Sequence, residues 1–238
     1  MKTTTSNGTR ISRSVGPSGD PGRAFDFKTD ILWKIFRVLS EFIEGFEFLS
    51  EFRRPVTIFG SAKTRHASPY YKASHMLAKR LGKAGFSIIT GGGPGIMEAA
   101  NRGAFEAKAQ SVGLNIQLPF EQRINKFVKK GMGFFYFFTR KTMLSMSAQA
   151  YVFFPGGYGT MDEFFTICTL MQTKKIETRP LVLFGSTFWA PLDQFVREKM
   201  LKDKSISDAD VKLYTITDSV DEAAKLILKS KEKQYTSI

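Results

Sequence analysis

The chain has 238 residues, 42% hydrophobic and 24% charged, which is ordinary for a globular protein and enough for one α/β domain with a full core. Its formal net charge is +13, and a basic surface attracts phosphate groups, whether of a small ligand or of a nucleic acid. One cysteine and two histidines exclude an internal disulfide and a zinc site of the Cys/His type, so we expect no metal.

Residues 1–25 predict a disordered basic tail. Four basic residues stand against one acid in residues 1–24, and residues 1–19 contain no apolar run, which argues against a secretory signal. No uncharged apolar stretch reaches 18 residues, so we expect no membrane-spanning helix. Together these features predict a cytoplasmic protein with no membrane partner.

An amphipathic helix is predicted over residues 30–53, with Asp30 as its N-cap, because apolar side chains recur there at helical spacing. The simplest interpretation is a helix that packs on the domain core. A dimerisation helix or a membrane-surface helix is the alternative, and the acids within the segment disfavour the membrane.

From Pro55 onward, short apolar runs bounded by turn residues alternate with helical patterns. This order predicts an α/β fold: a single Rossmann-like domain over residues 26–238, with a doubly wound parallel sheet and helices on both faces. The predicted strands cover residues 56–59, 86–90, 112–117, 134–138, 151–154, 181–184 and 213–217. The predicted helices cover residues 69–83, 96–106, 141–149, 160–173, 189–201 and 220–229.

Two glycine-rich turns each follow a predicted strand and open a helix: TGGGPGIME at residues 90–98 and PGGYGTMDE at residues 155–163. Neither fits the dinucleotide fingerprint or the P-loop, and residues 111–119 supply no acid for the ribose of NAD. Glycines let backbone N–H groups approach an anion, and the following helix directs its positive end at it. Because the carboxyl ends of parallel strands share one edge, the two turns predict one composite pocket.

Arg140 and Glu163 are the candidate functional side chains at this edge. We expect Arg140 at the start of a helix, where its charge opposes the dipole, so forked binding of a phosphate or carboxylate better explains its presence. We expect Glu163 in the first turn of the next helix. It either stabilises the dipole, as Asp162 would, or holds ribose hydroxyls and the oxocarbenium-like charge of a breaking glycosidic bond. Lys141 either assists Arg140 or lies on the surface.

The segment PGGYGTMDE matches P-G-G-x-G-T-x-x-E, the signature of the LONELY GUY family of cytokinin-activating phosphoribohydrolases. The chain resembles this family from about residue 26 to residue 229. Residues 91–97 resemble the family's first glycine-rich motif, and Arg140-Lys141 resembles its Arg-Lys pair. The long N-terminal helix and residues 93–101 resemble the longer bacterial branch, often labelled lysine decarboxylase-like or Rossmann fold protein.

The resemblance implies hydrolysis of the N-glycosidic bond of a nucleoside 5′-monophosphate, either AMP or a cytokinin riboside monophosphate. The products would be the free base and ribose 5-phosphate, and no cofactor is implied. Arg140 and Glu163 would be the catalytic pair, in a homodimer or higher oligomer with sites near the interface. The residues implied to bind substrate are Gly91, Gly92, Gly93, Gly95, Met97, Glu98, Lys141, Gly156, Gly157, Gly159 and Thr160.

Three other functions compete with this interpretation. Lysine decarboxylation normally needs pyridoxal phosphate on a Schiff-base lysine, and no lysine stands in a recognisable site of that kind. A non-catalytic carrier of a nucleotide or cofactor is the main alternative, because similar folds hold such ligands without cleaving them. A nucleic-acid-binding protein is least favoured, because the basic residues show no interleaved aromatic motif of a known module. The sequence identifies no proton donor for the departing base.

Overall fold

The computed structural model describes residues 31–116 and 124–230. The predicted tail and the Asp30 cap lie outside these residues. Two compact units, residues 1–41 and 42–238, are distinguished, with their boundary inside helix α1 (Ile31–Ser50). Of the first unit, only the helical residues 31–41 are described. The expectation of one domain over residues 26–238 stays a prediction.

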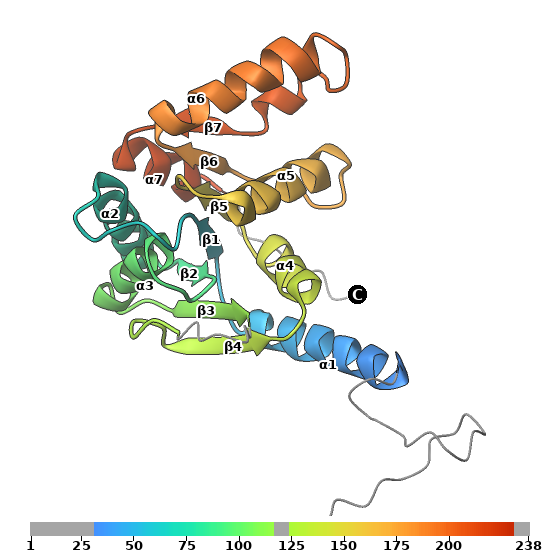
Figure 1. Cartoon of the computed structure of the whole chain (residues 1–238). Coiled ribbons are helices and arrows are strands. Elements are labelled where there is room, and N and C mark those ends of the chain that lie inside the picture. The colour runs from blue at the N-terminus through green and yellow to red at the C-terminus, as the bar shows by residue number, and fades with distance from the viewer. Residues whose placement is uncertain (1–30, 117–123, 231–238) are drawn as a thin grey trace, which may run out of the picture. The chain divides into compact units, whose positions relative to one another are not determined.

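The second unit contains one sheet of seven parallel strands, in the order β4-β3-β2-β1-β5-β6-β7 (Figure 1). The order reverses at β1, which pairs with both β2 and β5. This topology confirms the predicted α/β fold with a doubly wound parallel sheet. The strands are β1 (Pro55–Phe59), β2 (Ser87–Thr90), β3 (Ser111–Ile116), β4 (Lys130–Phe134), β5 (Ala150–Phe153), β6 (Leu181–Phe184) and β7 (Thr215–Thr217).

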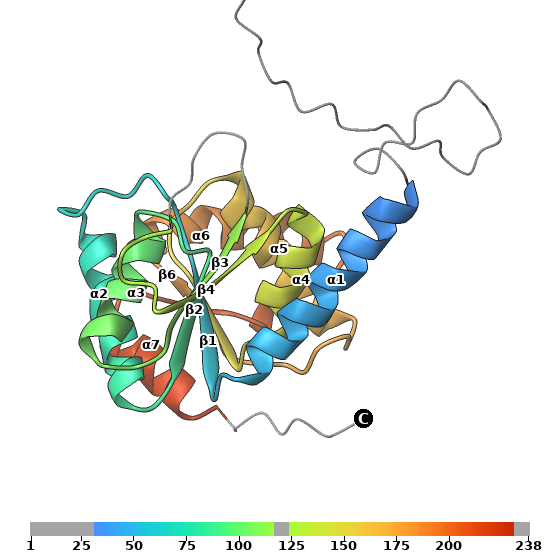
Figure 2. The same ribbon diagram turned by 90° about the horizontal axis from the view of Figure 1, so that it is seen from below.

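Helices cover both faces of the sheet (Figure 2). Helices α2 (Pro69–Lys83), α3 (Ile96–Glu106) and α7 (Val220–Leu228) share one buried cluster with the strands. Helices α4 (Phe137–Met146), α5 (Tyr158–Gln172) and α6 (Ser186–Phe195) share the other, and a π-helix, Val196–Leu201, continues α6. Because helices pack on both faces of the sheet, its strands need apolar side chains on both faces. Strands β1, β2, β5 and β6 are accordingly buried at every position.

Alternation along β1 shows how a continuous apolar run supplies both layers. Val56 and Ile58 enter the cluster with α2 and α3, whereas Phe59 enters the cluster with α4 and α5. Within the second unit, Leu49 in the last turn of α1 and Phe52, two residues after the helix ends, are buried in the latter cluster. That end of the N-terminal helix therefore packs on the domain core, whereas Ile43 and Phe46, earlier in the helix, are exposed; core packing of the whole helix stays a prediction.

The prediction was wrong between residues 130 and 149. A strand was expected at 134–138, but the strand is β4, Lys130–Phe134, and the residues from Phe137 onward form α4, which ends at Met146. Strand β4 lies at the sheet edge and has exposed positions at Lys130, Gly131 and Gly133, so it lacks an apolar run. The phenylalanines that follow have high β propensity, but tertiary context places them in a helix.

Candidate functional site

Three loops meet at the carboxyl edge of the central strands. The turn after β1 lies between the two glycine-rich turns, because β1 is flanked by β2 and β5. Ser61 in this turn donates its backbone N–H to the Pro155 carbonyl (3.0 Å), and its carbonyl accepts from the Ile96 N–H (3.1 Å). Ser61 thereby connects the start of the second glycine-rich turn to the start of α3. No motif in the sequence identified this residue.

The first glycine-rich turn needs glycine for its backbone and for close approach. Gly92 and Gly95 have φ angles of +73° and +68°, and a Cβ on Gly95 would collide with the Ser61 carbonyl. A Cβ on Gly91 would collide with the guanidinium of Arg140 and would lie 2.8 Å from the Met97 sulfur. The fold therefore brings Arg140 and Met97 against the first turn.

The second glycine-rich turn is open at the helix start. Gly157 is the N-cap of α5, and a Cβ built on Gly157 or Gly159 would meet nothing within 4 Å. A Cβ on Gly156, in contrast, would collide with the buried Thr160 side chain. Gly156 is thus required for packing, whereas Gly157 and Gly159 leave free space over the positive end of a 15-residue helix.

Glu163 lies in the second turn of α5, and not in the first turn as expected, because the helix begins earlier, at Tyr158. Simple dipole stabilisation at the helix start therefore does not account for it. Its Oε2 is buried and has no hydrogen-bond partner among the described residues. Burial raises the pKa of Glu163 to about 7, although the charges of Arg140 and Lys141 oppose this rise.

Arg140 lies in the first turn of α4, as expected, and is largely enclosed. Its Nε donates to the Leu114 carbonyl on β3 (2.7 Å). Burial lowers the pKa of Arg140, and the charge of Glu163 acts against this lowering. Beside this pair, Lys141 forms a 2.6 Å ion pair with the exposed Asp162. On α4 and α5, Lys141 and Asp162 thus form an ion pair at the surface, whereas the charges of Arg140 and Glu163 act on each other in the enclosed part of the site.

Glu98 has different neighbours. Its Oε1 lies 3.4 Å from His66 Nε2 and 3.5 Å from the Tyr71 hydroxyl. Glu98 is in the first turn of α3, so it shares the carboxyl edge with the glycine-rich turns. Its described polar contacts are with this histidine and tyrosine and not with Arg140 or Glu163.

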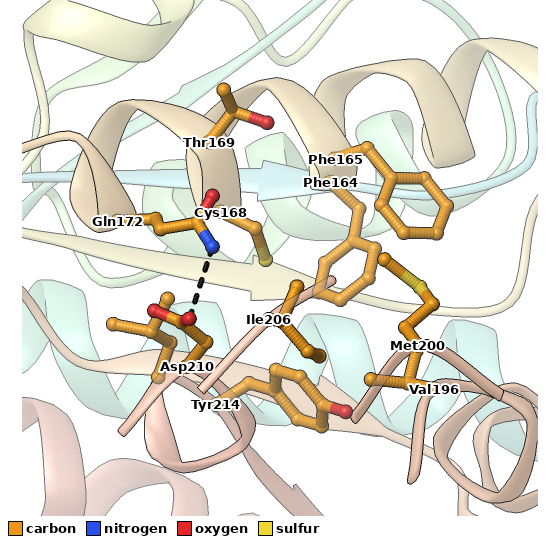
Figure 3. A pocket seen from close by; sticks show the side chains of 11 residues that line it. Phe164, Phe165, Cys168, Thr169, Gln172, Val196, Met200, Ile206, Asp210 and Tyr214 are labelled. Carbon is orange, nitrogen blue, oxygen red and sulfur yellow. Dashed lines mark hydrogen bonds between the residues drawn. The ribbon is translucent and has the colours of Figure 1, made fainter. Parts of the chain in front are cut away.

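A separate apolar pocket lies along another flank of α5 (Figure 3). Phe164, Cys168 and Gln172 line it at helical spacing, and Gln172 donates to Asp210 across it (3.0 Å). Burial raises the pKa of the Cys168 thiol to about 12, which favours the protonated thiol, and in this pocket it is a lining residue. None of the residues predicted to bind substrate lines this pocket.

Within residues 31–116 and 124–230, no three His, Cys, Asp or Glu side chains gather in a way that would hold a metal ion. Over the same residues, no helix has the length and hydropathy needed to cross a membrane.

The fold and the position of the candidate site place the protein among the Rossmann-like α/β proteins, whose ligand sites lie at the carboxyl edge of the sheet. Residues 97–227, more than half of the chain, match the family model described as "Possible lysine decarboxylase", and the chain belongs to this family. This membership and the rice relatives described next together confirm the resemblance to the LONELY GUY proteins.

Individual relatives agree with this assignment. "Cytokinin riboside 5′-monophosphate phosphoribohydrolase LOG" of Oryza sativa subsp. japonica is 28% identical over 186 residues, which cover 77% of this chain and 74% of that protein. A probable cytokinin riboside 5′-monophosphate phosphoribohydrolase of the same subspecies is 30% identical over 139 residues, 57% of this chain and 55% of that protein. The molybdenum cofactor carrier protein of Chlamydomonas reinhardtii has a similar fold, with a TM-score of 0.57 and 20% identity, over 74% of this chain and 99% of that chain.

Proposed function

We propose that this protein hydrolyses the N-glycosidic bond of a nucleoside 5′-monophosphate, AMP or a cytokinin riboside monophosphate, to the free base and ribose 5-phosphate. The observation that carries the proposal is the enclosed Glu163, whose unpartnered oxygen lies in the helix that begins at the open second glycine-rich turn. The rice relative named as a cytokinin riboside 5′-monophosphate phosphoribohydrolase supports the same reaction.

The 5′-phosphate would bind at the start of α5. The free space at Gly157 and Gly159 lets an anion approach the backbone N–H groups there, and the helix dipole favours its charge. Thr160, Gly156 and the first glycine-rich turn complete this part of the proposed site.

Glu163 would act on the ribose. Its unpartnered oxygen can accept hydrogen bonds from ribose hydroxyls, and its carboxylate stabilises positive charge at the anomeric carbon as the bond to the base breaks. Water then forms the new bond to the anomeric carbon, and the proton that water loses balances the one that the departing base gains. A pKa of about 7 leaves Glu163 able to give or take a proton near neutral pH.

Arg140 would bind the phosphate while it lies against the first glycine-rich turn. Its Nε is engaged by Leu114, and its guanidinium lies against Gly91, so it has a fixed direction at the carboxyl edge. A planar guanidinium fixed in this way suits forked contact with phosphate oxygens. Lys141 lies beside Arg140 and forms its ion pair with Asp162 at the surface. Met97 lies against Gly91 in the first turn, and Glu98 follows it in the first turn of α3.

A homodimer, or a higher oligomer, with sites near the interface is part of the proposal. Large apolar side chains are exposed in the second unit on α1 and α4, among them Ile43, Phe46, Phe137, Phe138 and Met146. Exposed apolar side chains in such number mark association surfaces. Phe137 and Phe138 share the first turn of α4 with Arg140, so a partner seated on them would lie beside the site.

The test is product analysis with purified protein, AMP and isopentenyladenosine monophosphate. Free base and ribose 5-phosphate are expected from the native protein and from Asp162→Asn, and not from Glu163→Gln. Asp162→Asn is the matched control, because it alters the neighbouring, exposed acid on the same helix. If Glu163→Gln retained full turnover, the assignment of Glu163 would be wrong.

A non-catalytic carrier is the second candidate, since a protein of similar fold is named as a molybdenum cofactor carrier. Binding of a nucleotide that is recovered intact would favour it. Lysine decarboxylation, which the family description names, stays disfavoured: Lys141, the lysine beside Arg140, is held by Asp162. Release of CO₂ from lysine in the presence of pyridoxal phosphate would reverse this judgement.

A further inference from the structure

The first glycine-rich turn is anchored by an asparagine outside the motif. Asn125, in the connection before β4, donates from Nδ2 to the Gly92 carbonyl (3.1 Å) and to the Gly93 carbonyl (3.0 Å). Its backbone N–H also donates to the Gly92 carbonyl (2.8 Å). One residue therefore holds two consecutive carbonyls of the turn.

A second asparagine fixes the first. Asn101, fully buried on α3, accepts from Asn125 Nδ2 (2.9 Å) and from the Thr90 hydroxyl (2.6 Å). Its own Nδ2 donates to Ser111 Oγ (3.0 Å) and to the Val112 carbonyl (3.2 Å). The network thus runs from β2 and β3 to the turn, and a buried network with its partners satisfied is rigid.

The geometry of the peptide bond means that this anchoring also sets the direction of a backbone N–H in the turn. In a trans peptide the C=O and the N–H point in opposite directions. Drawing the Gly92 carbonyl toward Asn125 therefore turns the N–H of Gly93 away from Asn125. The N–H of Gly92 is already committed to Thr90 Oγ1 (2.9 Å), so the Gly93 N–H is the donor whose direction Asn125 sets.

We propose that Asn125 is a positioning residue, which, held by Asn101, aims the Gly93 N–H at the phosphate of the bound nucleotide. The inference rests on the proposed function for the identity of the ligand. Without the clamp, the turn would need to be ordered when the ligand binds, and affinity would fall while the groups at the anomeric carbon stay in place.

The test compares the full-length native protein with Asn125→Asp, Asn125→Ala and Ser111→Ala. Asn125→Asp replaces the donor with a carboxylate that faces three acceptors, and Asn125→Ala removes the donor without adding charge, in case the first variant folds poorly. Ser111→Ala is the matched control: it removes the hydrogen bonds between Ser111 and Asn101, while Asn101 keeps its bond to the Val112 carbonyl and still accepts from Asn125, so the contacts with the turn stay in place. Three quantities are measured: hydrogen exchange over residues 91–97, the Kd for AMP, and KM with kcat.

Both Asn125 variants are expected to exchange faster over residues 91–97 and to bind AMP about tenfold more weakly, with kcat kept within about threefold. Ser111→Ala is expected to keep the native Kd. Native affinity in the Asn125 variants, or an equal loss in Ser111→Ala, would overturn the inference. If the native protein binds AMP without cleaving it, the proposed reaction fails, but the comparison of Kd values still tests whether Asn125 positions the turn. If the native protein binds no AMP, hydrogen exchange over residues 91–97 is the remaining test. Faster exchange in the Asn125 variants alone supports the anchoring of the turn by Asn125, and unchanged exchange refutes it.

Discussion

Replacing Glu163 with glutamine tests the buried carboxylate through stability, independently of any substrate. Burial raises the pKa of Glu163 from its ordinary 4.5 to about 7. A carboxyl group whose pKa is raised on folding favours the folded state fully below its unfolded pKa. This contribution is lost as the pH rises through the folded pKa. Each pKa unit corresponds to about 1.36 kcal/mol, so the native protein loses about 3 kcal/mol of stability from this group between pH 4 and pH 8.

Glutamine has no such titration. The free energy of unfolding of Glu163→Gln relative to the native protein is therefore expected to rise by about 3 kcal/mol from pH 4 to pH 8. Urea unfolding at several pH values measures this difference. Asp162→Asn, at the exposed Lys141 ion pair, is the control and is expected to change stability by less than about 1 kcal/mol. A difference for Glu163→Gln that stays flat between pH 4 and pH 8 would refute the reasoning about burial.

Three further predictions follow from the site and its surroundings. Gly159→Ala is expected to leave the free energy of unfolding unchanged or raise it by up to about 1 kcal/mol in urea unfolding, since the new Cβ meets nothing and α5 gains a helix former. The same variant is expected to raise KM about tenfold, because the Cβ would occupy the space where the phosphate approaches; an unchanged KM would show that no ligand approaches there. Arg140→Lys loses the forked donor and the contact to Leu114, so kcat/KM is expected to fall about 100-fold in steady-state assays, and a loss below about threefold would contradict its role. Phe138→Lys is expected to convert the oligomer to a monomer in sedimentation equilibrium, whereas Phe195→Lys, equally exposed on α6, is expected to leave it intact; oligomers in both would place the interface elsewhere.

Most of the fold was predictable because apolar runs and turn residues report local structure directly. Strand β6 and helices α2 and α3 begin and end as predicted. The exception is β4, where the glycines at positions 131 and 133 have no side chain to give an apolar signal, so that the Phe-rich segment after it was mistaken for the strand. Edge strands with one neighbour are defined by backbone pairing, which leaves little trace in composition.

The candidate site was predictable to the extent that glycine spacing encodes it. Both turns, and a position for Arg140 at the same edge of the sheet, followed from the motifs and from the shared edge of parallel strands, whereas the contact of Arg140 with Gly91 did not. The roles of Ser61 and Asn125 did not, because their contacts are with backbone atoms far away along the chain. The burial of Glu163 also depends on how α4 and α5 pack, which no local pattern specifies.

The position of Ser61 has a consequence for how binding energy is used. Its two hydrogen bonds come from main-chain atoms, so any side chain compatible with the turn preserves them. The conformational entropy of holding the second glycine-rich turn against the start of α3 is then lost once, when the chain folds, and ligand binding does not have to pay it. A site preorganised in this way can tolerate other side chains at the position of Ser61, so a comparison of sequences alone would not reveal the connection.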